Sequence, residues 1–234
     1  MVDMSTAGAA GDADLLEGLR QRNARSFEQL MRRYNRLLFR AARGIVPDDA
    51  EAQDAVQEAW LKAFVALDEF RAESSLATWL VRIAINQALS QQRKLGRTVS
   101  WEEQPDAEDS DMAGYNRGDI TTSDWPTPEE EAQRRQLRRQ LEAAIDLLAP
   151  RYRSVFMLRA VEGMSVEDTA AALAVSLEVV KTRFLRARAM LRSHLTPAAE
   201  AEAPRVHDFL GVRCDDMVSH VLARLRAQGV LRDQ

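Results

Sequence analysis

Apolar side chains recur every three to four residues through most of the first hundred positions, which is the spacing of one face of an α-helix. The pattern predicts four helices, over residues 15–23, 27–44, 48–67 and 76–93. Ser26 and Asp48 are the expected caps of the second and third helices, and Gly44 and Pro47 separate the two. No segment alternates apolar and polar residues as a half-buried strand does. This half of the chain is therefore predicted to be all-α.

A second helical stretch begins after residue 128. Helices are predicted over residues 129–148, 151–162, 165–173 and 177–194. Ser165 lies three residues before Asp168, the spacing of an N-cap followed by an acid in the first turn. Only Ala174–Val175–Ser176 joins the last two helices, which makes them a candidate helix-turn-helix. Other helical hairpins share this spacing, so the short turn alone leaves both interpretations open.

The periodicity fails between the two helical halves. Residues 97–128 contain three prolines, two glycines and many Asp, Glu, Ser and Thr residues. Too few apolar side chains are present to offset the entropy of ordering, so a flexible acidic linker is predicted. Trp101 and Trp125 are the exceptions, and they either pack on a neighbouring domain or dock to a partner.

Charge is segregated along the chain, although the net charge is only −4. Residues 97–133 hold two basic and eleven acidic residues, whereas residues 134–195 hold twelve basic and six acidic residues. Binding to a polyanion is therefore plausible for the basic block only. The one cysteine, Cys214, excludes an internal disulfide framework and fits a reducing compartment. With no leader sequence and no long apolar stretch, we expect a cytoplasmic protein without membrane insertion.

The helix predicted after residue 176 has two different faces. Val180, Phe184, Ala187 and Leu191 share one stripe that should face a core. The opposite face carries Glu178, Lys181, Thr182, Leu185 and Ala189, flanked by Arg183, Arg186, Arg188 and Arg192. Such a helix suits the major groove of DNA, where cations neutralise phosphates and shorter side chains reach base edges. A solvated basic face is the alternative.

Basic, polar and aromatic residues also gather in the first half. Residues 71–76 precede Trp79 and a predicted helix that carries Arg82 and Asn86. This mixture suits single-stranded or distorted DNA, on whose bases aromatic rings stack. Packing in a core is the alternative for Trp60 and Trp79.

Three segments together resemble the extracytoplasmic-function sigma factors of bacterial RNA polymerase. Residues 70–94 (FRAESSLATWLVRIAINQALSQQRK) resemble the segment of that family that recognises the −10 element and melts the promoter. Residues 48–64 (DDAEAQDAVQEAWLKAF) resemble the helix by which the family holds the polymerase, and residues 148–191 resemble its −35-binding domain. The resemblance implies an all-α fold of two small helical domains, sigma domain 2 and sigma domain 4. The divisions it implies are a disordered N-terminus (1–13), region 2 (14–96), the acidic linker (97–128), region 4 (129–195) and a C-terminal extension (196–234).

The resemblance implies a dissociable polymerase subunit rather than an enzyme, with no cofactor and no metal. Its implied partners are core RNA polymerase, through the clamp of the β′ subunit, promoter DNA and an anti-sigma factor. Polymerase contacts carry over to Asp54, Gln57 and Glu58. Contacts to the −10 element carry over to Arg71, Glu73, Ser74, Ser75, Leu76, Arg82 and Asn86. Contacts to the −35 element carry over to Lys181, Thr182, Arg183, Leu185 and Arg186.

The chain departs from the family in two places. Ser176 and Glu178–Val179 stand where the family has Pro and Gly-Thr, which leaves the −35 sequence unpredictable. The extension beyond residue 195 predicts an amphipathic helix, with apolar residues at Met217, Val218, Val221, Leu222 and Leu225. This helix either packs on a sigma domain or regulates by covering one, and His207, Cys214 and His220 are only weak candidates for a metal or thiol sensor.

The sequence leaves two other function classes as alternatives to a sigma factor. A stand-alone helix-turn-helix regulator would bind its operator without polymerase and would not need the clamp-like face of residues 48–64. An enzyme is disfavoured, because the chain shows no Gly-rich phosphate loop and no close acid–base cluster.

Overall fold

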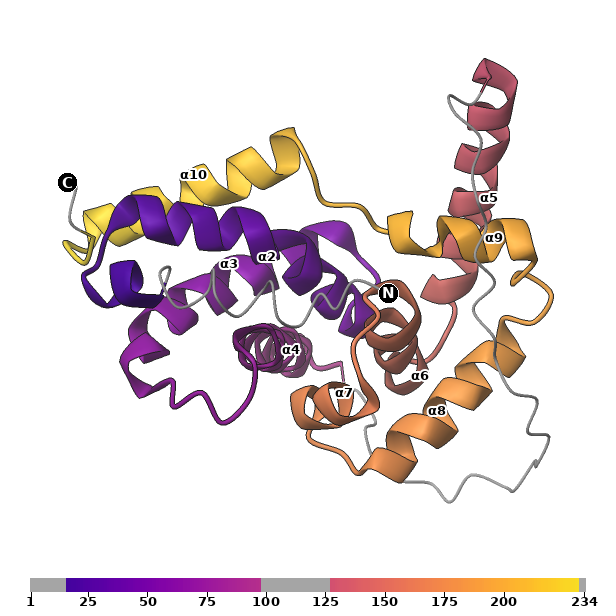
Figure 1. Ribbon diagram of the computed structural model, residues 1–234, viewed down its shortest axis with the longest axis horizontal. Helices are drawn as coiled ribbons and strands as arrows, with labels where there is room; N and C mark the ends of the chain where they lie inside the picture. Colours follow the sequence, from indigo (N-terminus) through magenta and orange to yellow (C-terminus); the bar gives the residue numbers. More distant parts are fainter. Residues whose placement is uncertain (1–15, 98–126, 232–234) are drawn as a thin grey trace.

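The computed structural model describes residues 16–97 and 127–231, and every regular element within these ranges is helical (Figure 1). This confirms the all-α prediction. The predicted disordered N-terminus and nearly all of the predicted linker, with Trp101 and Trp125, lie outside the described residues. Within them, no helix is long and apolar enough to cross a membrane.

Three long helices form the first half: α2 (Ala24–Ile45), α3 (Asp49–Ala66) and α4 (Leu76–Lys94). A 3₁₀ turn, Leu67–Glu69, follows α3. Asp48 caps α3 as predicted, and Ser75 caps α4. The cap of α2 is Asn23 rather than Ser26, because the Asn23 side chain accepts the Ser26 N–H at 3.0 Å. The helix therefore begins three residues earlier than the apolar pattern indicates.

The core of this half is built around Trp60, which is fully buried. Phe27 meets the Trp60 ring edge to face, with 5.7 Å between the ring centroids. The indole N–H donates to Asn35 Oδ1 at 2.7 Å, which satisfies both buried polar groups. Trp60 is thus a core residue. Of the two interpretations of its ring in the sequence, stacking on DNA bases or packing in a core, the structure shows packing in a core.

The second half consists of α5 (Pro128–Asp146), α6 (Pro150–Phe156), α7 (Val166–Leu173) and α8 (Leu177–Met190). A π-helical turn, Met157–Val161, continues α6. Ser165 caps α7 and Ser176 caps α8, and between them Ala174 turns the chain with a left-handed φ of 54°. The predicted helix-turn-helix geometry is therefore present.

The C-terminal extension folds back over both halves. It consists of α9 (Pro197–Glu202), a 3₁₀ turn (Ala203–Arg205) and α10 (Val212–Ala227). α9 packs against α5, whereas α10 lies along α2 and α3, as the yellow and indigo ribbons show (Figure 1). All five predicted apolar positions of α10 are buried. The amphipathic helix predicted in the extension therefore packs on the first helical half.

The two halves touch each other directly. The end of α2 packs on α6, and α4 packs on α7. A Cβ atom at Gly44 would lie only 2.8 Å from the Ser154 Cα, so the α2–α6 contact requires glycine at this position. Buried side chains of α6 and α7 join the apolar core of α2, α3 and α4. The two helical halves are therefore packed against each other through the α2–α6 and α4–α7 contacts. We call this packing of the two halves the closed arrangement.

Candidate functional site

The exposed face of α8 carries the side chains that the helical wheel assigns to DNA. Lys181, Thr182 and Leu185 are exposed, while Val180, Ala187 and Leu191 are buried against the core. Glu178 pairs with Lys181 at 2.9 Å on the solvent side, where the pair contributes little to stability. The face therefore presents a cation, a hydroxyl and an apolar side chain within two adjacent turns of the helix.

Two of the flanking arginines behave differently from the helical-wheel prediction. Arg183 is only 4% exposed, because it lies on the side of α8 that packs toward the rest of the chain. Arg188 pairs with Glu200 of α9 at 3.0 Å. Arg186 is half-buried. In this closed arrangement, Arg183 is thus not on the exposed face of α8.

The loop before α4 and the exposed side of α4 bring together most of the residues expected at the −10 element. Arg71, Glu73, Arg82 and Asn86 are exposed. The rings of Phe70 and Trp79 lie 5.2 Å apart beside the loop. Ser74 is half-buried, and the Ser75 hydroxyl caps the helix by accepting the Thr78 N–H at 3.1 Å. Leu76 differs from the expectation, because it is 4% exposed and anchors the loop in the core.

The start of α4 is joined to the helix-turn-helix. The Thr78 hydroxyl donates to Asp168 Oδ1 at 2.8 Å, and Asp168 Oδ2 accepts from Ser165 at 2.7 Å. Thr78 is 2% exposed and Asp168 is half-buried, so this contact is partly buried between the two halves. The candidate −10 and −35 surfaces are therefore held close together.

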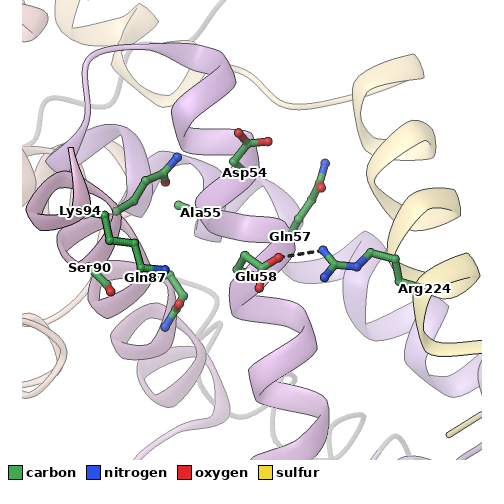
Figure 2. Close-up of a pocket in the computed structure, with 9 residues that line it drawn as sticks. Asp54, Ala55, Gln57, Glu58, Gln87, Ser90, Lys94 and Arg224 are labelled. Atoms are coloured by element: carbon green, nitrogen blue, oxygen red, sulfur yellow. Dashed lines mark hydrogen bonds and ion pairs between the residues drawn. The ribbon is translucent and has the colours of Figure 1, made fainter. Parts of the chain in front are cut away.

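A polar groove of about 400 Å³ lies between α3 and α4 (Figure 2). One wall carries Asp54, Gln57 and Glu58, the predicted polymerase contacts, and Asp54 and Glu58 are exposed. Arg224 of α10 reaches the groove and pairs with Glu58 at 2.7 Å, drawn as a dashed line in Figure 2. The three predicted residues therefore form one surface, next to the extension.

The opposite wall of the groove was not predicted from the sequence. It consists of polar residues of α4, namely Gln87, Ser90, Gln91 and Lys94. Their spacing of three, one and three residues places them on one helix face. That polar stripe was readable in the sequence, but only the packing of α4 beside α3 turns it toward Asp54.

Buried arginines join the two halves. Arg153 of α6 donates to the carbonyls of Gly44 and Ile45 at the end of α2, at 3.2 and 2.8 Å. Arg43 of α2 donates to Asp146 at 2.7 Å. Burial lowers the pKa of Arg153 to about 10, which leaves it charged at neutral pH, and burial raises the pKa of Asp146. Arg43 is thus paired with a carboxylate and Arg153 is hydrogen-bonded to backbone carbonyls, which offsets the cost of burying the two charges.

The candidate sensor residues do not assemble into a site. Cys214 is buried in α10 and its sulfur accepts from Asn35 Nδ2 at 3.2 Å. His207 is buried between the halves, whereas His220 is exposed on α10. In the part of the chain that the structure describes, no three His, Cys, Asp or Glu residues are placed to hold a metal ion.

Comparison with known proteins matches both helical halves. Sigma-70 region 2 matches residues 30–98, and Sigma-70, region 4 matches residues 138–191. The RNA polymerase sigma-H factor of Pseudomonas aeruginosa is 33% identical over 187 residues, which are 80% of this chain and 94% of that protein. The chain belongs to the extracytoplasmic-function sigma factors. The resemblance noted in the sequence is thereby confirmed, and this sigma factor acts in transcription initiation by RNA polymerase as a non-enzymatic subunit.

Two further comparisons agree with this family. The ECF RNA polymerase sigma-E factor of Haemophilus influenzae is 32% identical to the sigma factor over 80% of this chain and 96% of that protein. The solved structure of CnrH in complex with the cytosolic domain of CnrY has a TM-score of 0.52 and 28% identity, covering 77% of this chain and 94% of CnrH. The region 4 match ends at residue 191, before α9 and α10 begin. The extension therefore follows both matched regions.

Proposed function

We propose that the sigma factor holds the clamp of core RNA polymerase with the face of α3 that carries Asp54, Gln57 and Glu58. The exposure of the two carboxylates supports this assignment, as does their position inside the region 2 match. Carboxylates aimed into solvent suit a basic partner surface, because complementary charge steers association. Lys94 on the opposite wall extends the same groove.

The −10 element is read by the loop of residues 71–75 together with Arg82 and Asn86 on α4. Promoter melting turns a base out of the duplex, and a base that loses its stacking needs a pocket with polar and aromatic partners. The exposed Arg71 and Glu73 and the nearby Phe70–Trp79 pair supply groups of this kind. Leu76 contributes by anchoring the loop rather than by touching DNA.

The −35 element is read by α8 in the major groove. Lys181 and Arg186 contact phosphates, while Thr182 and Leu185 reach base edges. The exposed face of α8 within the region 4 match is the observation that carries this assignment. Arg183 is buried in the closed arrangement. It therefore joins these contacts only after region 4 separates from region 2.

Promoter binding requires the closed arrangement to open. The −10 and −35 elements lie about 25 base pairs apart, which is about 85 Å of DNA at 3.4 Å per base pair. Laid end to end, α4, α7 and α8 measure only roughly 60 Å at 1.5 Å per residue. Since α4 packs on α7, the two DNA-binding surfaces cannot reach both elements until these helices separate.

The divisions expected from the sequence belong to this proposal: region 2 over 14–96, the linker over 97–128, region 4 over 129–195 and the extension over 196–234. We also propose a cytoplasmic location, since a polymerase subunit works beside the chromosome. CnrH was solved with the cytosolic domain of CnrY. By analogy, a protein inhibitor of the anti-sigma kind is a further expected partner.

In vitro transcription tests the proposed function directly. Purified core polymerase is given a genomic promoter library with the full chain or with Asp54→Arg, whose exposed side chain makes no contribution to the core. We expect transcripts downstream of a common bipartite motif with the native chain, and none with Asp54→Arg. Tight binding to one DNA sequence without polymerase, and no new transcripts, would instead indicate a stand-alone regulator.

A further inference from the structure

The extension is bound to region 2 through an interface of the kind found in a protein core. Six side chains of α10 face α2 and α3 and are at most 8% exposed: Cys214, Met217, Val218, Val221, Leu222 and Leu225. A polar contact lies within the same interface, since Asn35 of α2 donates to the Cys214 sulfur. An apolar stripe of this length favours a docked helix over a free one.

Ion pairs surround this apolar interface and orient α10. Asp215 accepts from Arg32 of α2 at 2.5 Å, and Arg213 donates to Asp49 at the start of α3 at 2.9 Å. At the other end of α10, Arg224 pairs with Glu58. Arg224 is therefore bound to one of the residues proposed to contact polymerase, at the edge of the groove drawn in Figure 2.

The loop before α10 links the extension to both halves. Arg40 of α2, which is 1% exposed, donates to the carbonyls of Pro204 and Val206 at 2.7 and 2.9 Å. The His207 N–H donates to Glu142 of α5 at 2.8 Å. Phe209 stacks on Phe39 with 4.5 Å between the ring centroids. Residues 204–209 therefore lie between region 2 and region 4 and contact each.

From this arrangement we propose that the C-terminal extension is an internal inhibitor, which keeps the two regions closed and, through Arg224, occupies the edge of the α3 face proposed to bind polymerase. The occupant of this surface is α10 of the same chain. Polymerase and α10 then compete for the face around Glu58, and the extension must leave before polymerase binds. The inference rests on the proposed role of Asp54, Gln57 and Glu58.

In such a competition, only molecules whose extension is released can bind polymerase. The apparent affinity equals the intrinsic affinity multiplied by the fraction of released molecules. A variant that releases α10 should therefore bind polymerase more tightly than the native chain. Release itself has an independent reporter, because Cys214 is the one cysteine of the sequence and is buried on the face of α10 that packs on region 2. Its rate of reaction with a thiol reagent measures how often the extension undocks.

Val221→Asp in the full chain is the releasing variant, since Val221 is fully buried against region 2. Ala223→Asp is the matched control, because it adds the same charge to the exposed side of α10. With Val221→Asp, we expect Cys214 labelling and the affinity for core polymerase each to rise at least ~10-fold. Ala223→Asp should leave both within about two-fold of the native values.

Faster Cys214 labelling without tighter polymerase binding would overturn the proposal. If Val221→Asp does not fold, Arg224→Glu decides in its place, because it sets two carboxylates against each other at an exposed rim. Arg224→Glu should raise the rate of Cys214 labelling and the affinity for core polymerase several-fold. If neither the labelling rate nor the affinity changes, the proposal is also overturned. Asp54→Arg in the released background tests the polymerase assignment separately: retained polymerase binding contradicts that assignment while leaving the Cys214 result intact.

Discussion

The Thr78 hydroxyl at the start of α4 donates a 2.8 Å hydrogen bond to Asp168 Oδ1 at the start of α7. These residues are 90 positions apart, and each lies in the first turn of its helix. The bond ties the helix assigned to the −10 element to the helix-turn-helix assigned to the −35 element. The bond can form only while the two halves are packed together, so its contribution to stability reports on the closed arrangement.

Replacing Thr78 by Val should remove this hydrogen bond while nearly keeping the volume of the side chain. The variant leaves Asp168 with one hydrogen-bond donor fewer in a partly buried contact, so we expect the free energy of unfolding to fall by about 1–2 kcal/mol. Urea denaturation monitored by circular dichroism gives the value. A loss below about 0.3 kcal/mol would show that the two halves are not in contact in solution.

Gly44→Ala should also destabilise the chain, for a steric reason. Alanine in a helix is normally more favourable than glycine by roughly 0.5–1 kcal/mol, but here its Cβ would meet the Ser154 backbone at 2.8 Å. We expect a net loss of about 1–3 kcal/mol of unfolding free energy and a larger radius of gyration in X-ray scattering. A stabilised chain of unchanged size would contradict the α2–α6 contact.

The helices themselves were predictable from the sequence, and their arrangement was not. Local signals such as the apolar spacing, the Asp48 cap and the three-residue turn that ends at Ser176 set the elements to within a few residues. The closed arrangement depends on Arg40, Arg43 and Arg153, which read as ordinary helix-surface arginines in the sequence. Their burial follows from partners more than one hundred residues away, which no local pattern encodes.

In the candidate site, too, helix faces were predictable from the sequence, whereas burial by distant segments was not. The exposed face of α8 followed from helical geometry alone, because Lys181, Thr182 and Leu185 lie opposite a continuous apolar stripe. Leu76 was assigned to DNA from its motif position and Arg183 from the helical wheel as well as the motif, yet both are buried by contacts with the folded chain. Residue type and spacing predict a face of a helix, whereas burial depends on what packs against it.

Lys181→Ala should weaken −35-dependent transcription by the holoenzyme and flatten its dependence on salt. Loss of one phosphate contact lowers the slope of log affinity against log salt concentration by about 1. Arg36→Ala, at an exposed position of α2 outside the assigned surfaces, is the control and should leave the slope unchanged. A cost of about 1–3 kcal/mol confined to one base position would assign Lys181 to a base instead.

Acid should loosen the loop around His207. Burial, together with Arg43, Arg40, Arg153 and Arg213, lowers the pKa of His207 to about 3 from its ordinary 6.5. Between these values the unfolded chain binds the extra proton, so the contribution to stability is complete above pH 6.5 and is lost as the pH falls toward 3. At pH 5.5 the loss is on the order of 1 kcal/mol.

His207→Gln isolates this effect in urea unfolding at pH 7.5 and 5.5. Glu142 and Asp146, which face His207, titrate in the opposite sense because burial raises the pKa of both. They remain in the variant, so the difference between native and variant chains reports His207 alone. Equal pH dependence in the two chains would mean that His207 is not buried in solution.

Hydrogen–deuterium exchange of the native sigma factor, free and bound to core polymerase, tests the central claim most directly. In the free chain, amides of both α3 and α10 should be protected, since the two helices pack together. Polymerase should increase protection across residues 49–66 and expose residues 212–227. Continued protection of residues 212–227 in the complex, with no change across residues 49–66, would contradict the account.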